Sequence, residues 1–151
     1  DLAFHTVEGS PPGLRRRTLF TERYVLAGRV GHPRLLRQLT LADFCELEHV
    51  IVSPDRGGFV GVTDDVLAKS GMKRKVVLSV PNFLFMMSVL ASTDLVAMVP
   101  SRLVRSTETL QIVESPVDVP SYEMVMLWHE RSHRDPAHQW LRETILKSAS
   151  G

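Results

Sequence analysis

The sequence predicts an α/β fold in which most strands of the sheet run parallel. Short runs of β-branched and apolar residues alternate along the chain with segments that carry helix-start signals. Glycine, proline or serine follows most of the strand-like runs and ends them. Strands that alternate with helices favour βαβ units, whose right-handed crossovers cover both faces of a sheet.

The expected strands share a short length and a high content of valine, isoleucine, leucine and aromatic residues. They lie at residues 1–4, 23–30, 49–52, 76–80, 95–99, 110–113 and 122–128. The first of them begins within its pattern, so we expect this chain to start inside a larger protein.

Each expected helix has a signal at one of its ends. Thr40 caps one helix, and Asp43 stands in its first turn, where a carboxylate meets the positive end of the helix dipole. Asp135, followed by proline at the first helical position, opens an amphipathic helix through residue 147. The other helices are expected at 60–70, 83–91 and 101–104, with Gly71 as a left-handed C-cap of the first and Asn82 and Ser101 as N-caps of the others.

Composition excludes several classes of protein. Apolar residues make up 44% of the 151 residues and charged residues 23%, a balance that excludes a disordered chain. The formal net charge is only +1, so no strong field attracts nucleic acid or a membrane surface. Cys45 is the single cysteine, which excludes an internal disulfide and fits a reducing cytoplasm. Residues 79–100 are almost uncharged, but Pro81, Asn82 and Asp94 divide them into soluble elements rather than a membrane span.

The loops after three expected strands are predicted to form one ligand site. Ligands of parallel sheets bind beyond the carboxyl ends of the strands, which brings residues 53–59, 81–83 and 100–102 together. Asn82 and the N–H groups at the next helix start lie beside Phe83, a pairing that suits a planar ligand with a carboxylate or phenolate. Two interpretations stay open for His49: a hydrogen-bonded core residue, or a side chain that faces the ligand.

Other motifs have simpler interpretations. Residues 129–133, His-Glu-Arg-Ser-His, match the H-E-x-x-H pattern of zinc metalloproteases, which requires an α-helix. They follow a strand and precede a helix cap, so we expect a loop there and no metal site. We interpret the basic runs 15–17 and 73–75 as solvated surface rather than phosphate contacts, and Gly57-Gly58 as a turn. No nucleophile lies in a recognisable elbow and no carboxylate pair suggests acid and base, so neither an enzyme nor a cofactor is expected.

Several segments together resemble the LysR-type transcriptional regulators. The N-terminal order DLAF at 1–4, ERYVLAG at 22–28 and TLADF at 40–44 resembles these regulators after the middle of their effector domain. The segments VPNF at 80–83 and STDLVAMVP at 92–100, with residues 128–142, are similar to the subgroup that includes the nodulation and the naphthalene- or salicylate-responsive activators. The similarity runs over nearly the whole chain.

The resemblance implies a Rossmann-like, periplasmic-binding-protein-like effector domain of two lobes, joined by two crossover strands, with a small molecule in the cleft between them. It assigns residues 1–30 to the remainder of lobe one and the first crossover strand, 31–118 to a complete lobe two, and 119–151 to the second crossover and the return to lobe one. The first part of lobe one is missing. DNA would be bound only through an N-terminal winged helix-turn-helix absent from this chain.

The resemblance also implies a site and partners. Its cleft-lining positions fall on His49, Ser53, Phe59, Pro81, Asn82 and Phe83. The expected ligand is a small aromatic or carboxylate effector, and the expected protein is a cytoplasmic homodimer or homotetramer that needs no membrane. Two alternatives stay open: a periplasmic-type solute-binding protein of the same architecture, which would need an export signal, and the H-E-x-x-H metalloprotease.

Overall fold

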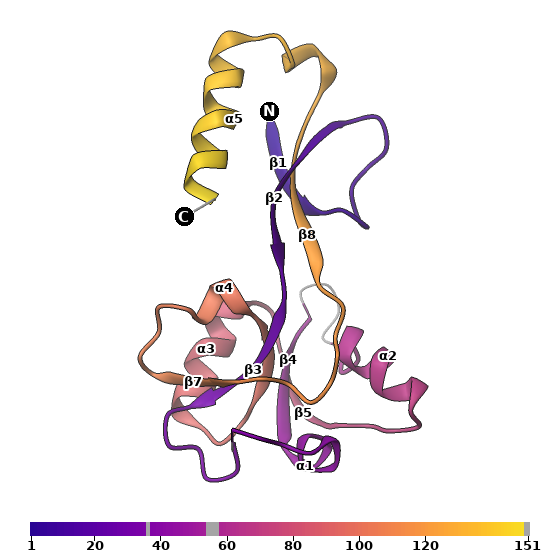
Figure 1. Cartoon of the computed structure of the whole chain (residues 1–151), viewed down its shortest axis with the longest axis vertical. Helices are drawn as coiled ribbons and strands as arrows, with labels where there is room; N and C mark the ends of the chain where they lie inside the picture. Colours follow the sequence, from indigo (N-terminus) through magenta and orange to yellow (C-terminus); the bar gives the residue numbers. More distant parts are fainter. Residues whose placement is uncertain (36, 54–57, 150–151) are drawn as a thin grey trace. The chain divides into compact units, whose positions relative to one another are not determined.

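A computed structural model describes residues 1–35, 37–53 and 58–149 (Figure 1). Contacts between residues divide the chain into two compact units. The first unit is formed by Asp1–Glu22 together with Ser121–Gly151, and the second by Arg23–Pro120. The second unit is therefore inserted between the two segments of the first.

The first unit is an antiparallel sheet with one long helix. Strand β8 (Tyr122–Trp128) lies between β1 (Leu2–Thr6) and β2 (Arg15–Glu22), and it pairs antiparallel with both. Helix α5 (Pro136–Ala149) contacts β2. Strand β2 was not predicted, because its arginine-rich start lacks the apolar alternation of a half-buried strand.

The second unit has a mixed sheet. Strand β4 (Glu48–Val52) pairs parallel with β5 (Lys75–Val80), and a parallel bridge from His49 to Val96 joins it to β6 (Ala97–Pro100). Strand β3 (Tyr24–Arg29) lies between β6 and β7 (Leu110–Val113) and runs antiparallel to both. The expected parallel arrangement is confirmed for β4, β5 and β6. It is wrong for β3 and for the first unit, where β1 and β2 both run antiparallel to β8.

The helices of the second unit begin close to the predicted caps. They are α1 (Leu41–Glu46), α2 (Val62–Lys69), α3 (Phe83–Ser92) and α4 (Ser101–Val104). Thr40 and Asp43 form a reciprocal capping box, and the Asn82 side chain accepts the Phe85 N–H. Gly71 has a φ of 66°, the left-handed conformation expected after a helix. Ser101 is the first residue of α4 rather than its cap, a position that Pro100 takes.

Both faces of the second unit's sheet are covered. Val25 and Ala27 of β3 pack in one buried cluster with Leu90 of α3, whereas Leu26 packs in another with Phe44 of α1 and Leu67 of α2 (Figure 1). Adjacent residues of β3 thus serve opposite faces, as the pleat requires. This burial explains the apolar stretch at 79–100, and no helix in the described ranges is long and apolar enough to cross a bilayer.

Candidate ligand-binding site

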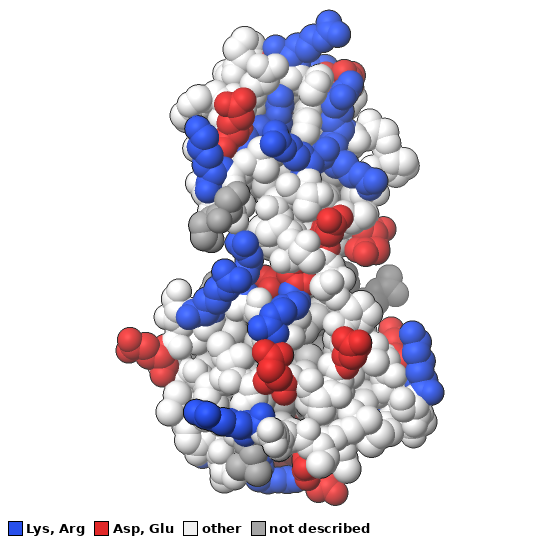
Figure 2. Space-filling view, viewed as in Figure 1, with Lys and Arg blue, Asp and Glu red and all other residues white. Residues whose placement is uncertain are grey.

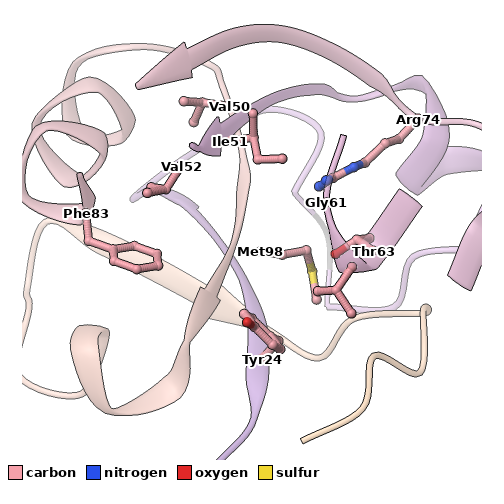
Figure 3. Close-up of a pocket in the computed structure, with 10 residues that line it drawn as sticks. Tyr24, Val50, Ile51, Val52, Gly61, Thr63, Arg74, Phe83 and Met98 are labelled. Atoms are coloured by element: carbon pink, nitrogen blue, oxygen red, sulfur yellow. The ribbon is translucent and has the colours of Figure 1, made fainter. Parts of the chain in front are cut away.

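A cavity of about 190 Å³ opens at the carboxyl end of β4, within the second unit (Figure 3). We call it the β4 cavity. Its walls come from β4, from the starts of α2 and α3, and from Tyr24 of β3 and Met98 of β6. Cavities of roughly 150 Å³ are enough for one benzene ring, so the β4 cavity has the size of a single-ring ligand.

Apolar side chains form most of the cavity wall, with two hydroxyl groups among them. Val52, Phe83 and Met98 supply the apolar surface, and Figure 3 shows the Phe83 ring and the Tyr24 ring directed toward the space from different elements. Tyr24 and Thr63 carry the hydroxyl groups. A pocket of apolar walls with a few polar groups is typical of a small-molecule site.

Helices α2 and α3 both begin at the β4 cavity. The first N–H groups of a helix lack partners within the helix and favour an anion. In α3, Asn82 Oδ1 accepts the Phe85 N–H at 2.9 Å, and the Asn82 carbonyl accepts the Met86 N–H at 3.2 Å. The N–H groups of Phe83 and Leu84 have no partner among the residues that the structure describes.

A buried ion pair fixes the start of α2. Arg74 is 5% exposed and donates to both carboxylate oxygens of Asp64, at 2.9 and 2.7 Å. Asp64 also accepts the Gly61 N–H at 2.8 Å. Burial raises the pKa of Asp64, but these hydrogen bonds outweigh it and hold that pKa below its ordinary value. Arg74 therefore lines the cavity with its charge already balanced, and the prediction that it is solvated is wrong.

Of the six predicted site residues, Phe83 is the one that lines the β4 cavity. Pro81 and Asn82 directly precede it and are exposed, and the Asn82 side chain caps α3 instead. Ser53 Oγ accepts the Gly58 N–H at 3.0 Å. Phe59 lines a separate cavity of about 430 Å³ beside α2. Residues 54–57 of the predicted loop, including Gly57, lie outside the described residues.

His49 belongs to the core. Its side chain is 0% exposed, its Nε2 donates to the Phe44 carbonyl at 2.8 Å, and its ring packs on the Phe44 ring with centroids 4.6 Å apart. Burial lowers its pKa from 6.5 to about 4. Of the two interpretations left open by the sequence, the geometry favours the hydrogen-bonded core residue, because His49 does not line the β4 cavity.

Sequence reasoning missed Tyr24, Thr63 and Met98. Tyr24 is the first residue of β3, and it reaches the carboxyl edge of β4 only because β3 runs antiparallel. The strand pattern indicates that β3 exists but says nothing about its direction. Thr63 is the second residue of α2, a helix whose start was predicted within two residues, so this local signal could have identified Thr63.

The H-E-x-x-H segment lacks the geometry of a zinc site. Glu130–Ser132 form one 3₁₀ turn rather than an α-helix, and Glu130 pairs with Arg15. His133 Nδ1 accepts the Trp128 indole N–H at 3.3 Å. Within the described ranges, no group of three or more histidine, cysteine, aspartate or glutamate side chains is placed to hold a metal ion.

Comparison with known proteins gives a consistent result. The model of the LysR substrate binding domain matches residues 1–150. The HTH-type transcriptional regulator SyrM 1 of Sinorhizobium fredii is 38% identical over 154 residues, covering 99% of this chain and 45% of that protein. The HTH-type transcriptional activator NahR of Pseudomonas putida is 34% identical over 149 residues, covering 97% and 49%.

A solved structure agrees with these relatives. The regulatory domain of MexT, a transcriptional activator in Pseudomonas aeruginosa, superposes with a TM-score of 0.77 at 32% identity, covering 97% of this chain and 71% of that one. The chain spans about half the length of the curated relatives it matches. With its α/β architecture and its family match over nearly every residue, this chain belongs to the LysR substrate-binding domain family.

Proposed function

We propose that this chain senses a small aromatic carboxylate or phenolate and that the β4 cavity is where the ligand binds. One observation supports this most: an apolar space of about 190 Å³ lies where two helices begin. The ligand ring would contact Phe83 and Met98, and its anionic group would accept hydrogen bonds from the start of α3. Tyr24 and Thr63 offer hydroxyl groups to the same ligand.

The complete regulator is also part of the proposal. DNA binding would come from a winged helix-turn-helix outside this chain, in a cytoplasmic homodimer or homotetramer that performs no catalysis. The relatives named as HTH-type regulators support this, and they favour a regulator over a periplasmic solute-binding protein. The two units would correspond to parts of the two lobes of an effector domain. A ligand can shift such a protein between states only through its different affinity for each of them.

Calorimetric titration of the protein with salicylate, and separately with benzoate, tests the site. Phe83→Ala should weaken binding by about tenfold, since it removes the largest apolar contact. Phe85→Ala is the matched control, because Phe85 is on the same helix, is 55% exposed and does not line the cavity. Calorimetry is preferred because Trp128 and Trp140 both belong to the first unit, whereas the β4 cavity belongs to the second.

Two outcomes would contradict the proposal. One is the absence of a saturable heat for either aromatic acid. The other is an equal loss of affinity in Phe83→Ala and Phe85→Ala, which would indicate a general effect on α3 rather than a contact with the ligand.

A further inference from the structure

The first unit contains a separate pocket of about 350 Å³ with a strongly basic lining. We call it the arginine pocket. It is lined by Arg15, Arg16 and Arg17 of β2, Trp128 of β8, and His133 and Arg142. The sequence interpretation treated residues 15–17 as solvated surface. Basic side chains gather on the face of this unit seen in Figure 2.

Most of the positive charge in this pocket lacks a matching carboxylate. Arg15 forms a two-pronged ion pair with Glu130 and is balanced by it. Arg16 and Arg17 make no ion pair with any described residue, and neither does Arg142. Side chains alternate along a strand, so Arg15 and Arg17 share one face of β2, and Arg15 is paired in register with Trp128.

Arg142 is almost completely buried and makes several polar and ring contacts. It is 7% exposed, and its guanidinium lies over the Trp128 ring at 4.6 Å from the centroid. It donates to the carbonyls of His133, at 2.9 Å, and Ser132, at 3.3 Å, and to His138 Nδ1.

The hydrogen-bonding capacity of Arg142 is not exhausted by these partners. A guanidinium has five N–H donors, and the three bonds occupy three of them. The other donors have no partner among the described residues. A buried cation without a counter-charge is unfavourable, and an anion in the pocket would supply both the charge and the acceptors.

We propose that the arginine pocket binds a small oxyanion, namely the phosphate or carboxylate group of a small molecule. Arginine pairs with both groups through parallel hydrogen bonds, which its planar fork of donors makes geometrically specific. A small molecule is favoured over a nucleic-acid backbone because Arg142 lies inside a concave pocket and is not exposed on a flat surface. This site is in the other unit from the β4 cavity and does not depend on the function proposed there.

Trp128 provides a direct readout. The sequence has two tryptophans, so Trp140→Phe leaves Trp128, in contact with Arg142, as the single tryptophan. In that background the protein is titrated with sodium phosphate, and separately with sodium benzoate, while sodium chloride keeps the ionic strength constant. We expect a saturable change in emission with at least one of the two anions, and which one responds identifies the group that the pocket takes.

Two variants that each remove one positive charge distinguish binding at a specific site from a general electrostatic attraction of anions. Arg17→Gln should lower the affinity for the anion by roughly tenfold, since it removes one charge-assisted contact. Lys147→Gln removes the same charge from an exposed position on α5 outside the pocket, and it should change the affinity by less than about twofold. Arg142→Gln is not the main test, because Arg142 also anchors the turn at residues 132–133.

Three results would overturn the proposal: no saturation with either anion, equal weakening by Arg17→Gln and Lys147→Gln, or a response to a DNA duplex without a response to the small anions. Phe83→Ala distinguishes this site from the β4 cavity. It should leave the Trp128 response unchanged whether or not the proposed function is correct.

Discussion

His49 is a neutral imidazole inside the second unit. A carbonyl can only accept, so the bond to Phe44 places the proton on Nε2. Nδ1 then carries a lone pair and has no partner among the described residues. A proton added at Nδ1 would create a charge inside the core, and burial therefore holds the pKa near 4.

This burial predicts a loss of stability in mild acid. Between pH 6.5 and about 4, the unfolded chain binds a proton at residue 49 that the folded chain does not, so the free energy of unfolding falls as the pH falls. We expect it to decrease by about 2 kcal/mol from pH 7 to pH 5, measured by urea unfolding.

Two histidine variants check the assignment. His49→Gln keeps an N–H donor for the Phe44 carbonyl but removes the titrating group, so most of the decrease should disappear. His5→Gln, at an exposed position in β1, should leave the decrease unchanged. If both variants keep the full decrease, His49 is not its cause.

The predicted site residues show what local sequence can reveal. Phe83 lines the β4 cavity because it follows a strand end and begins a helix, and both signals are local. His49 and Val50 are adjacent in β4 and both are buried. The alternation of apolar and polar residues along the strand therefore could not predict which of the two faces the β4 cavity. Tyr24 was missed because its place depends on how β3 pairs with distant strands.

At the scale of elements, the cap of α3 stabilises the wall of the β4 cavity. Asn82→Ala removes the acceptor for the Phe85 N–H, and we expect the free energy of unfolding to fall by about 1 kcal/mol in urea titrations. Asn82→Asp retains an acceptor at the same place and should lose much less. Equal losses in both variants would mean that the amide of Asn82 matters for some other reason than the cap.

Elements were predictable where their signals are short-range. The caps predicted at Thr40, Asn82 and Asp135 involve partners three residues away, and the structure confirms them. Strand β2 is different, because Arg15 and its neighbours become a strand by pairing with β8, more than a hundred residues later. The antiparallel direction of β3 is likewise decided by its pairing with β6 and β7.

At the scale of the molecule, the two units differ in core size. Both apolar clusters belong to the second unit, whereas the first unit has about 50 residues and a single three-stranded sheet. Both tryptophans lie in the first unit, so their emission reports on it alone.

We therefore expect the first unit to unfold first in urea. The midpoint followed by tryptophan emission should be lower, by about 1 M, than the midpoint followed by far-ultraviolet circular dichroism, which senses both units. Trp140→Phe should preserve this difference, because Trp128 alone still reports on the sheet. A single coincident transition by both probes would show that the units unfold together.

The sheet order of the first unit delays the pairing of its early strands during synthesis. Strands β1 and β2 lie on either side of β8 and both form their sheet hydrogen bonds with it. The ribosome synthesises β8 roughly a hundred codons after β2. At about 5–20 residues per second, the two early strands wait roughly 5–20 s for a partner while the continuous second unit is completed. A message truncated before residue 122 would thus yield a complete second unit preceded by two strands that lack β8 as their partner.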